Sequence, residues 1–142
     1  MLVDSINNRA ASGETEATVL GPFYVPEPKT YPSGSNIAGA MKGIPLYIQG
    51  SVGDSQGAPI RGAIVDIWHS DEGGLYDVQQ MDALGGYSGR ARLGVAAEGR
   101  FACWTIKPIE YAIPDDGSVG RMLKAPGRHP GRSPHVHFMI AA

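Results

Sequence analysis

The chain has 142 residues, 42% of them hydrophobic, which suits one domain with one core. Its 12 basic and 14 acidic side chains leave a net charge of −2, which excludes the strongly basic footprint of a nucleic-acid-binding protein. The 20 glycines and 11 prolines favour short strands joined by turns over a helical bundle.

The sequence shows no pattern typical of membrane insertion or secretion. No run approaches the ~18 apolar residues that a membrane helix needs, and the first residues lack a basic and then apolar signal pattern. The one cysteine, Cys103, cannot form a disulfide within the chain, so nothing indicates an oxidising compartment. We expect a cytoplasmic protein with no membrane or nucleic-acid partner, in which Cys103 is a small buried apolar residue.

Residues 1–17 are the one helix-like stretch, because Leu2, Val3 and Ile6 form a short apolar stripe that Gly13 would end. A helix of this length needs packing to be stable. We expect a short helical or linker remnant here.

Residues 21–26 read Gly-Pro-Phe-Tyr-Val-Pro, and the prolines at both sides favour an extended path. Two interpretations are open at this point. The segment is a connector along the surface, or it is a rigid wall that carries Phe23 to a pocket.

Alternating or apolar runs bounded by turn clusters predict strands along the rest of the chain. The strongest run has both faces partly apolar, and the region between residues 78 and 99 is less clear. Strands are predicted at residues 46–52, 60–69, 90–95, 100–106 and 135–141, with a brief extended stretch at 75–77 and a short helical turn at 119–123. This pattern predicts an all-β fold, an antiparallel β-sandwich of short strands.

His135 and His137 would present two imidazoles on one face, because alternate residues of a strand point the same way. Two imidazoles together suggest a metal site, although a partly exposed strand with incidental histidines explains the same pattern. His69, at the end of a predicted strand, could be a further ligand, whereas His129 lies in a basic loop and is expected to be exposed. The carboxylates of residues 71–77 lie in a turn-like loop, and no spacing matches a zinc motif.

Two tyrosines are the other source of ligands. Tyr76 follows a glycine pair just beyond a predicted strand, and Tyr111 lies in a loop between prolines. A phenol with a pKa of ~10 is a poor ligand at neutral pH. A hard trivalent cation favours the phenolate, so two tyrosinates and two imidazoles would suit Fe(III). The alternative for each tyrosine is an amphipathic residue at a core edge, with its hydroxyl bonded to the backbone.

Ordered motifs run through nearly the whole chain and together are specific. They are Thr-Val-Leu-Gly-Pro-Phe-Tyr at residues 18–24, Pro-Ile-Arg-Gly-Ala at 59–63, Val-Asp-Ile-Trp-His at 65–69, Gly-Leu-Tyr-Asp-Val-Gln at 74–79, Gly-Arg-Phe at 99–101, Ile-Lys-Pro at 106–108, Tyr-Ala-Ile-Pro at 111–114, Gly-Arg-His-Pro at 127–130 and His-Phe at 137–138. In these motifs the chain resembles the intradiol ring-cleavage dioxygenases, the family of catechol and hydroxyquinol 1,2-dioxygenases. Residues 77–79 and 106–111 are most similar to the hydroxyquinol branch.

The resemblance implies a non-haem Fe(III) enzyme whose partners are a small aromatic diol and O2. Such an enzyme inserts both atoms of O2 into a catechol-type diol, hydroxyquinol or catechol, and yields a ring-opened muconate or maleylacetate. The resemblance also implies four iron ligands, with Tyr111 and His137 axial and Tyr76 and His135 equatorial.

The resemblance further implies roles beside the metal. Arg132 matches the family's active-site arginine, a cation that would stabilise developing charge on the substrate. Tyr111 is the expected base for a substrate proton. Phe23 and Pro26 fall where the family lines its substrate pocket, which favours the wall interpretation of residues 21–26.

The chain departs from the family pattern in two ways, and each departure leads to an expectation. Family members begin with a helical region and continue past the His-x-His strand, so we expect residues 1–142 to be a single truncated catalytic domain, with 1–17 as its remnant. Gly131 and Ser133 replace a tryptophan and a proline common in the family, which should loosen the loop that carries Arg132. An open sheet edge invites pairing, so we expect a homo-oligomer.

Two other functions remain open from the residues. One is a non-catalytic, transthyretin-like β-sandwich binding module, which need not retain the four ligands or Arg132. The other is a hydrolase with zinc on the His-x-His pair, which would be colourless and would need no tyrosine.

Overall fold

The structure, a computed structural model, describes residue 15, residues 18–112 and residues 131–142. The helical remnant predicted at residues 1–17 lies outside the described residues apart from Thr15. The helical turn predicted at 119–123 and His129 also lie outside them.

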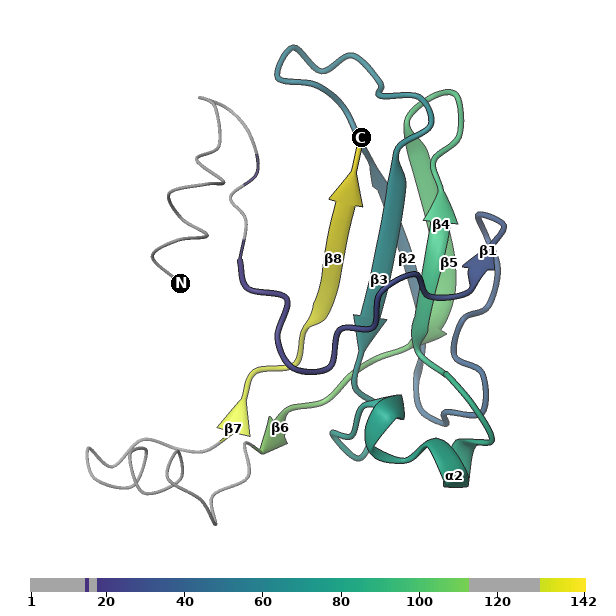
Figure 1. The fold of residues 1–142 in the computed structure, drawn as a ribbon, viewed down its shortest axis with the longest axis vertical. Helices are drawn as coiled ribbons and strands as arrows, with labels where there is room; N and C mark the ends of the chain where they lie inside the picture. The colour runs from purple at the N-terminus through teal and green to yellow at the C-terminus, as the bar shows by residue number, and fades with distance from the viewer. Residues whose placement is uncertain (1–14, 16–17, 113–130) are drawn as a thin grey trace, which may run out of the picture.

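Most of the regular secondary structure in the described part of the chain is strand, which confirms the all-β class. A turn of 3-10 helix, η1 (Asp77–Gln79), and one of α-helix, α2 (Met81–Leu84), lie between β3 and β4 (Figure 1). The strands are β1 (Thr30–Tyr31), β2 (Pro45–Ser51), β3 (Ile64–His69), β4 (Arg90–Gly94), β5 (Arg100–Ile106), β6 (Tyr111–Ala112), β7 (Gly131–Arg132) and β8 (Val136–Ala141).

The main sheet has four strands in the order β1-β4-β3-β8. Strand β3 is antiparallel to both neighbours, pairing Trp68 with Arg90 on β4 and with His137 on β8. The prediction of a wholly antiparallel arrangement is wrong at β1, which runs parallel to β4 with Thr30 beside Arg92. A long stretch of chain separates these two strands, so no tight hairpin imposes the antiparallel direction on them.

A second, two-stranded sheet pairs β2 with β5 in antiparallel register from Pro45–Ile106 to Ser51–Arg100. Side chains from both sheets meet in one core. Val65 and Leu93 of the main sheet are fully buried there together with Cys103 of β5, and Ile48 of β2 packs against them. Burial raises the pKa of the Cys103 thiol to about 11, which agrees with its predicted role as a buried apolar residue.

The segment between β3 and β4 differs from the prediction. The extended stretch expected at residues 75–77 ends one residue early, because Asp77 begins η1. The backbone N–H of Tyr76 donates to Oε1 of Gln79, and the Gln79 N–H donates back to the Tyr76 carbonyl at 2.9 Å. This local bonding closes a helical turn immediately after Tyr76 and fixes the direction in which the chain leaves it.

Within residues 18–112 and 131–142, no helix has the length and apolar character to cross a membrane.

Candidate metal centre

Four predicted side chains come together at one end of the main sheet. Tyr76 lies beyond the end of β3, and His135 and His137 lie at the start of β8. Tyr111 is on β6, which pairs with β7 so that Tyr111 is opposite Arg132. Figure 1 shows β6 and β7 below the main sheet, where β8 begins.

Three donor atoms face one another at this end of the sheet. The hydroxyl of Tyr76 lies 3.1 Å from Nε2 of His137 and 3.5 Å from Nε2 of His135. The two Nε2 atoms are themselves 3.1 Å apart. The triangle arises because the alternation of β8 places both imidazoles on one face, and the β3 end places the phenol above them.

Tyr111 is the fourth member of the cluster. Its ring centroid is 5.5 Å from that of Tyr76, nearly perpendicular to it, and 5.6 Å from that of His135. The guanidinium carbon of Arg132 lies 6.0 Å from the centroid of the Tyr111 ring. Arg132 is exposed, so its charge faces solvent beside the ring cluster.

The tautomer of His135 follows from its second nitrogen. Nδ1 lies 2.6 Å from the carbonyl of Ser133, which can only accept, so Nδ1 carries the proton. Nε2 of His135 is then the ring nitrogen that faces the cluster. Burial first, and then the neighbouring His135 and Arg132, lower the pKa of His137 to about 4, so the imidazole of His137 is neutral at pH 7.

Tyr76 is almost fully buried, with 1% of its surface exposed. Burial, with nearby Tyr111 as the second cause, raises the pKa of Tyr76 above its ordinary value. Without a bound cation this phenol therefore stays protonated at neutral pH.

The approach of the two tyrosines depends on a glycine. Gly74 has φ +76°, and a Cβ at this position would lie 2.8 Å from the carbonyl oxygen of Glu110 and 3.2 Å from Cα of Tyr111. Any larger residue would push the Tyr76 loop away from β6.

The other candidate ligands are used elsewhere. His69 is buried, with Nδ1 at 2.8 Å from the Ser70 carbonyl and Nε2 at 2.6 Å from Oγ1 of Thr105. Asp71 accepts hydrogen bonds within its own loop, including 2.8 Å from the N–H of Gly73. Asp77 pairs with a buried arginine, Arg90. Among the described residues, no group of three or more His, Cys, Asp or Glu side chains could hold a metal ion.

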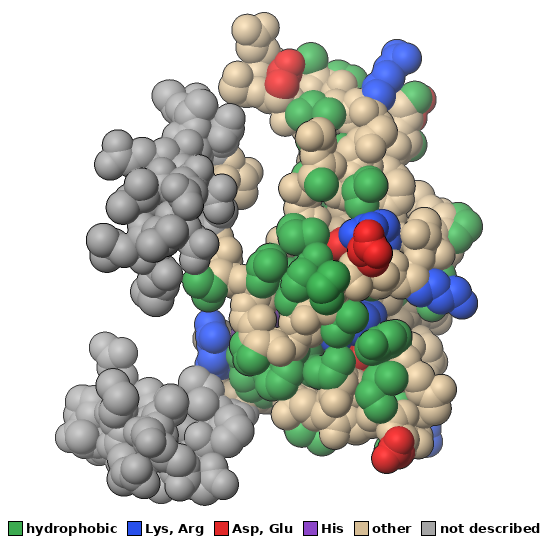
Figure 2. Space-filling model, in the orientation of Figure 1, with side chains coloured by type: hydrophobic (Ala, Val, Ile, Leu, Met, Phe, Trp, Pro, Cys, Tyr) green, Lys and Arg blue, Asp and Glu red, His purple; other side chains and the backbone are tan. Residues whose placement is uncertain are grey.

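The two predicted pocket residues differ in their surroundings. Phe23 is half-buried and stacks on Tyr76, with ring centroids 4.4 Å apart and planes 20° apart. Pro26 is exposed, and none of the contacts found in the described residues joins it to the four rings. Figure 2 shows hydrophobic side chains gathered over the lower half of this face, beside the end that carries β6 and β7.

Two residues at the site escaped the sequence reasoning. Trp68 lies flat against His137 across the β3–β8 pairing, and Arg90 binds the residue that follows Tyr76. The one signal for Trp68 was its position next to His69 at a strand end. Nothing in the local pattern marks Arg90, because its partner is 13 residues away on another element.

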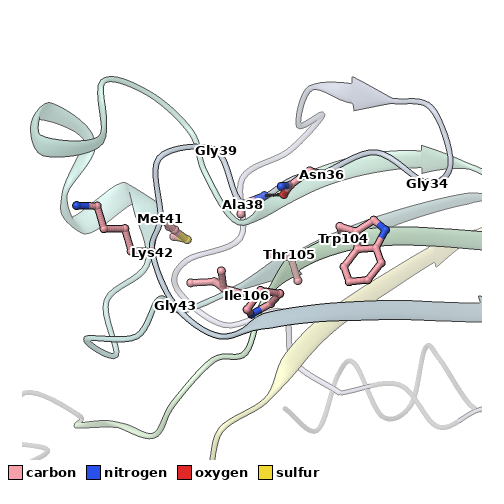
Figure 3. A pocket seen from close by; sticks show the side chains of 11 residues that line it. Gly34, Asn36, Ala38, Gly39, Met41, Lys42, Gly43, Trp104, Thr105 and Ile106 are labelled. Carbon is pink, nitrogen blue, oxygen red and sulfur yellow. Dashed lines mark hydrogen bonds between the residues drawn. The ribbon is translucent and has the colours of Figure 1, made fainter.

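A separate hollow of about 630 Å³ lies between residues 34–43 and β5, and Trp104, Lys42 and Thr105 are among its lining residues (Figure 3). None of the four clustered rings lines it, so it is distinct from the candidate metal centre.

Comparison with known proteins places this geometry in context. A family model described as Dioxygenase matches residues 19–142. The hydroxyquinol 1,2-dioxygenase of Rhizobium sp. (strain MTP-10005) is 42% identical over 142 residues, which are 100% of this chain and 48% of that protein. The 6-chlorohydroxyquinol 1,2-dioxygenase of Cupriavidus pinatubonensis is 44% identical, over 100% of this chain and 51% of that protein.

Solved structures that match this chain carry the same names as the sequence relatives, hydroxyquinol and catechol 1,2-dioxygenase. The hydroxyquinol 1,2-dioxygenase of Pseudomonas putida DLL-E4 matches with a TM-score of 0.89 and 41% identity, over 100% of this chain and 49% of that one. The catechol 1,2-dioxygenase of Acinetobacter radioresistens matches with a TM-score of 0.84 and 28% identity, over 93% of this chain and 43% of that one. The chain thus spans about half the length of the relatives that it matches.

Proposed function

The chain belongs to the intradiol ring-cleavage dioxygenases, a family that uses non-haem iron, and from this membership we propose that it binds Fe(III) and cleaves a catechol-type diol with O2. The observation that carries the proposal is the convergence of the Tyr76 hydroxyl with Nε2 of His135 and His137, with Tyr111 beside them. We propose these four side chains as the iron ligands.

The spacing of the donor atoms fits one metal ion. Ligand atoms that lie ~2.1 Å from one ion and at right angles to each other are ~3.0 Å apart. The three separations found here, 3.1, 3.1 and 3.5 Å, are close to that value. A ring cluster that served only packing would have no reason to aim three donor atoms at one point.

The donor set favours Fe(III) over zinc. The described residues offer no third His, Cys or carboxylate to complete a zinc site. The buried phenol of Tyr76 has a raised pKa, so only a strong Lewis acid would hold it as phenolate. A zinc hydrolase on the His-x-His pair would leave both tyrosines without a role, and family membership disfavours a transthyretin-like binding module.

When bound, Fe(III) would act as a Lewis acid on the diol and raise the reactivity of the ring carbon toward O2. The protein then has three tasks. We assign to Tyr111, whose ring lies beside Arg132, the role of accepting a substrate proton. Arg132 supplies a cation beside the ring cluster for the charge that develops on the substrate. Phe23 forms an apolar wall against Tyr76 and excludes water from that side.

We propose a hydroxyquinol-type diol as the first substrate to test. The matched proteins named hydroxyquinol 1,2-dioxygenases are 41–44% identical to this chain, whereas those named catechol 1,2-dioxygenases are 25–35% identical. We also propose that Pro26 lines the substrate pocket, for which its position in the sequence is the only support.

We further propose that the strands form a β-sandwich and that the protein acts as a homo-oligomer. The shared core of the two sheets supports the first point. Among the described strands, β8 pairs with β3 alone, and Phe138 and Ile140 on it are 44% and 49% exposed, which supports the second. Light scattering that finds a monodisperse monomer would contradict the oligomer.

Iron content together with the visible spectrum tests the proposed function. Purified, iron-loaded protein should hold one iron per chain and be wine-red from tyrosinate-to-iron charge transfer. Anaerobic addition of hydroxyquinol should shift the band, and admission of O2 should consume the diol. A colourless protein that binds no iron would remove the proposal, and zinc in its place would favour the hydrolase.

A further inference from the structure

A buried arginine joins two parts of the candidate site that the sequence keeps far apart. Arg90 on β4 is 4% exposed, and its guanidinium contacts both carboxylate oxygens of Asp77 and the backbone carbonyl of Phe23. We propose that Arg90 is a positioning residue, which locks Tyr76 and the Phe23 ring that stacks on it into one rigid unit. This role of Arg90 depends on the proposed function only for the last measurement, which uses the iron-loaded enzyme.

The first contact fixes the chain next to Tyr76. Nε of Arg90 donates to Oδ2 of Asp77 at 2.6 Å, and a second guanidinium nitrogen binds the other carboxylate oxygen. Asp77 is 1% exposed and also accepts the N–H groups of Val78 at 2.9 Å and Ser88 at 3.1 Å. A carboxylate held by four donors cannot rotate, and Tyr76 is its neighbour in the chain.

The second contact fixes the ring over Tyr76. Nη1 of Arg90 donates to the carbonyl of Phe23 at 3.1 Å. Residues 18–28 belong to no strand, so no ladder of backbone hydrogen bonds holds this segment to the sheet. The ring of Phe23 nevertheless stacks on Tyr76 at 4.4 Å and lies edge-on to Tyr111 at 6.4 Å.

Holding Asp77 and Phe23 together requires the planar guanidinium of Arg90, because a positive charge alone does not fix both directions. One planar group sends two parallel N–H bonds to Asp77 and a further N–H to Phe23. The ammonium of lysine is a point charge on a flexible stem and cannot hold both directions at once. An Arg90→Lys variant therefore keeps the buried charge paired with Asp77 but releases the carbonyl of Phe23.

A matched control lies two residues along the same strand. Arg92 on β4 makes a two-pronged pair with Asp66, at 2.8 Å from Nε to Oδ1 and 2.9 Å from Nη2 to Oδ2. The hydrogen bonds of its guanidinium go to Asp66, and none goes to Phe23 or to the residues around Tyr76. Arg92→Lys thus makes the same chemical change in the same sheet. Its partner Asp66 lies beside Tyr24, but the contacts of Arg90 with Asp77 and with the Phe23 carbonyl stay intact.

Chymotrypsin cleavage of the metal-free, full-length chain after Phe23 and Tyr24 tests the proposal without reference to iron. In Arg90→Lys this cleavage should be roughly 10-fold faster or more, the size expected for loss of a hydrogen bond from a charged donor. Cleavage within β3 and β5 should stay slow. Arg92→Lys should raise the cleavage after Phe23 and Tyr24 by less than Arg90→Lys does, because it leaves the bond to the Phe23 carbonyl in place.

Two results would overturn the proposal: unchanged cleavage after Phe23 and Tyr24 in Arg90→Lys, or a rise of the same size throughout the core. If Arg90→Lys does not fold, the double variant Asp77→Asn with Arg90→Gln replaces the ion pair by a neutral hydrogen-bonded pair and leaves no lone buried charge. The same local rise is expected in it, and its absence counts equally against the proposal.

The iron-loaded enzyme supplies the last readout. Arg90→Lys should keep the iron content of the parent while its charge-transfer band shifts and KM for the diol rises more than kcat falls, because the stacked wall has loosened. A parent protein that binds no iron would refute the proposed function and leave the cleavage result to decide the role of Arg90. Lower iron content with a normal band in the remaining fraction would show a merely structural role.

Discussion

The indole of Trp68 lies flat against the imidazole of His137, with ring centroids 4.6 Å apart and planes 1° apart. The two residues are direct partners in the β3–β8 pairing, so the sheet itself brings the rings together. Trp68 is 2% exposed, and Tyr24 packs on it at 5.0 Å. The buried indole of Trp68 therefore holds the imidazole of a proposed iron ligand in place, although Trp68 is not itself a proposed ligand.

We expect Trp68→Phe to weaken iron binding by roughly 10-fold, because residues that orient a metal ligand typically contribute this much or more to affinity. Stability should change little. The indole N–H of Trp68 has no hydrogen-bond partner among the residues that the structure describes, and its removal relieves a desolvation cost of about 1–3 kcal/mol that offsets the lost packing. Chelator competition measures the affinity, and urea unfolding measures the stability.

The other tryptophan is the control for this change. Trp104 is 47% exposed on β5 and pairs with Tyr47, away from the ring cluster. Trp104→Phe should leave iron affinity unchanged. An equal loss of affinity in both variants would show that the stack on His137 has no special role.

His137 should also make the metal-free protein sensitive to acid. Its pKa is about 4 in the folded state and ~6.5 in the unfolded chain. The unfolded state therefore takes up a proton first as the pH falls, so stability present above pH ~6.5 is lost progressively down to pH ~4. The loss has an upper bound of about 3 kcal/mol, reduced because the half-buried side chain is partly screened by solvent.

Urea unfolding of the metal-free protein at pH 7 and pH 5 measures this loss. His137→Asn should make the difference between the two pH values smaller. Some difference should remain, because burial also lowers the pKa of His69. An identical pH dependence in the parent and in His137→Asn would contradict the assignment.

The sequence predicted the pair of imidazoles but not what surrounds it. The alternation of a strand is a local rule, and it correctly placed His135 and His137 on one face. Tyr76 and Tyr111 carry no such local signal, because their approach depends on β6 pairing with β7 and on Gly74. The residues alone left both tyrosines open between a ligand and an amphipathic side chain at a core edge, and the resemblance to a family decided for ligands.

The remaining differences have the same physical origin. The parallel direction of β1 beside β4 and the contact of Arg90 with Phe23 join residues more than 50 positions apart, which no periodicity encodes. The turn of helix at Asp77 follows from hydrogen bonds to Gln79 and Arg90 that compete with the extended propensity of the chain. The strand at residues 100–106, by contrast, was predicted to the residue because its alternation is complete within itself.

Gly74→Ala should separate the two tyrosines and remove the charge-transfer band or shift it strongly. The new methyl group would lie 2.8 Å from the Glu110 carbonyl oxygen, so either the Tyr76 loop or β6 must move. Gly62→Ala is the matched control, because Gly62 has the same φ of +76° but no atom of the described residues lies within 4 Å of the added Cβ. Both variants should lose about 1 kcal/mol or more through backbone strain, but only Gly74→Ala should change the visible spectrum.

Arg132→Ala should keep the iron and the colour of the protein but lose about 100-fold or more in turnover, because one fixed charge at the reacting group is removed. The guanidinium lies beside the Tyr111 ring, is exposed and is absent from the set of donor atoms, so iron content should stay at the parent value. Arg132→Lys should recover only part of the rate, since a lysine ammonium does not reproduce the planar donor group.

Arg100→Ala, at an exposed position on β5, is the control and should keep full turnover. Stopped-flow single turnovers with hydroxyquinol and O2 measure the chemical step directly, and full turnover in Arg132→Ala would leave the developing charge without a protein partner and refute the role of Arg132.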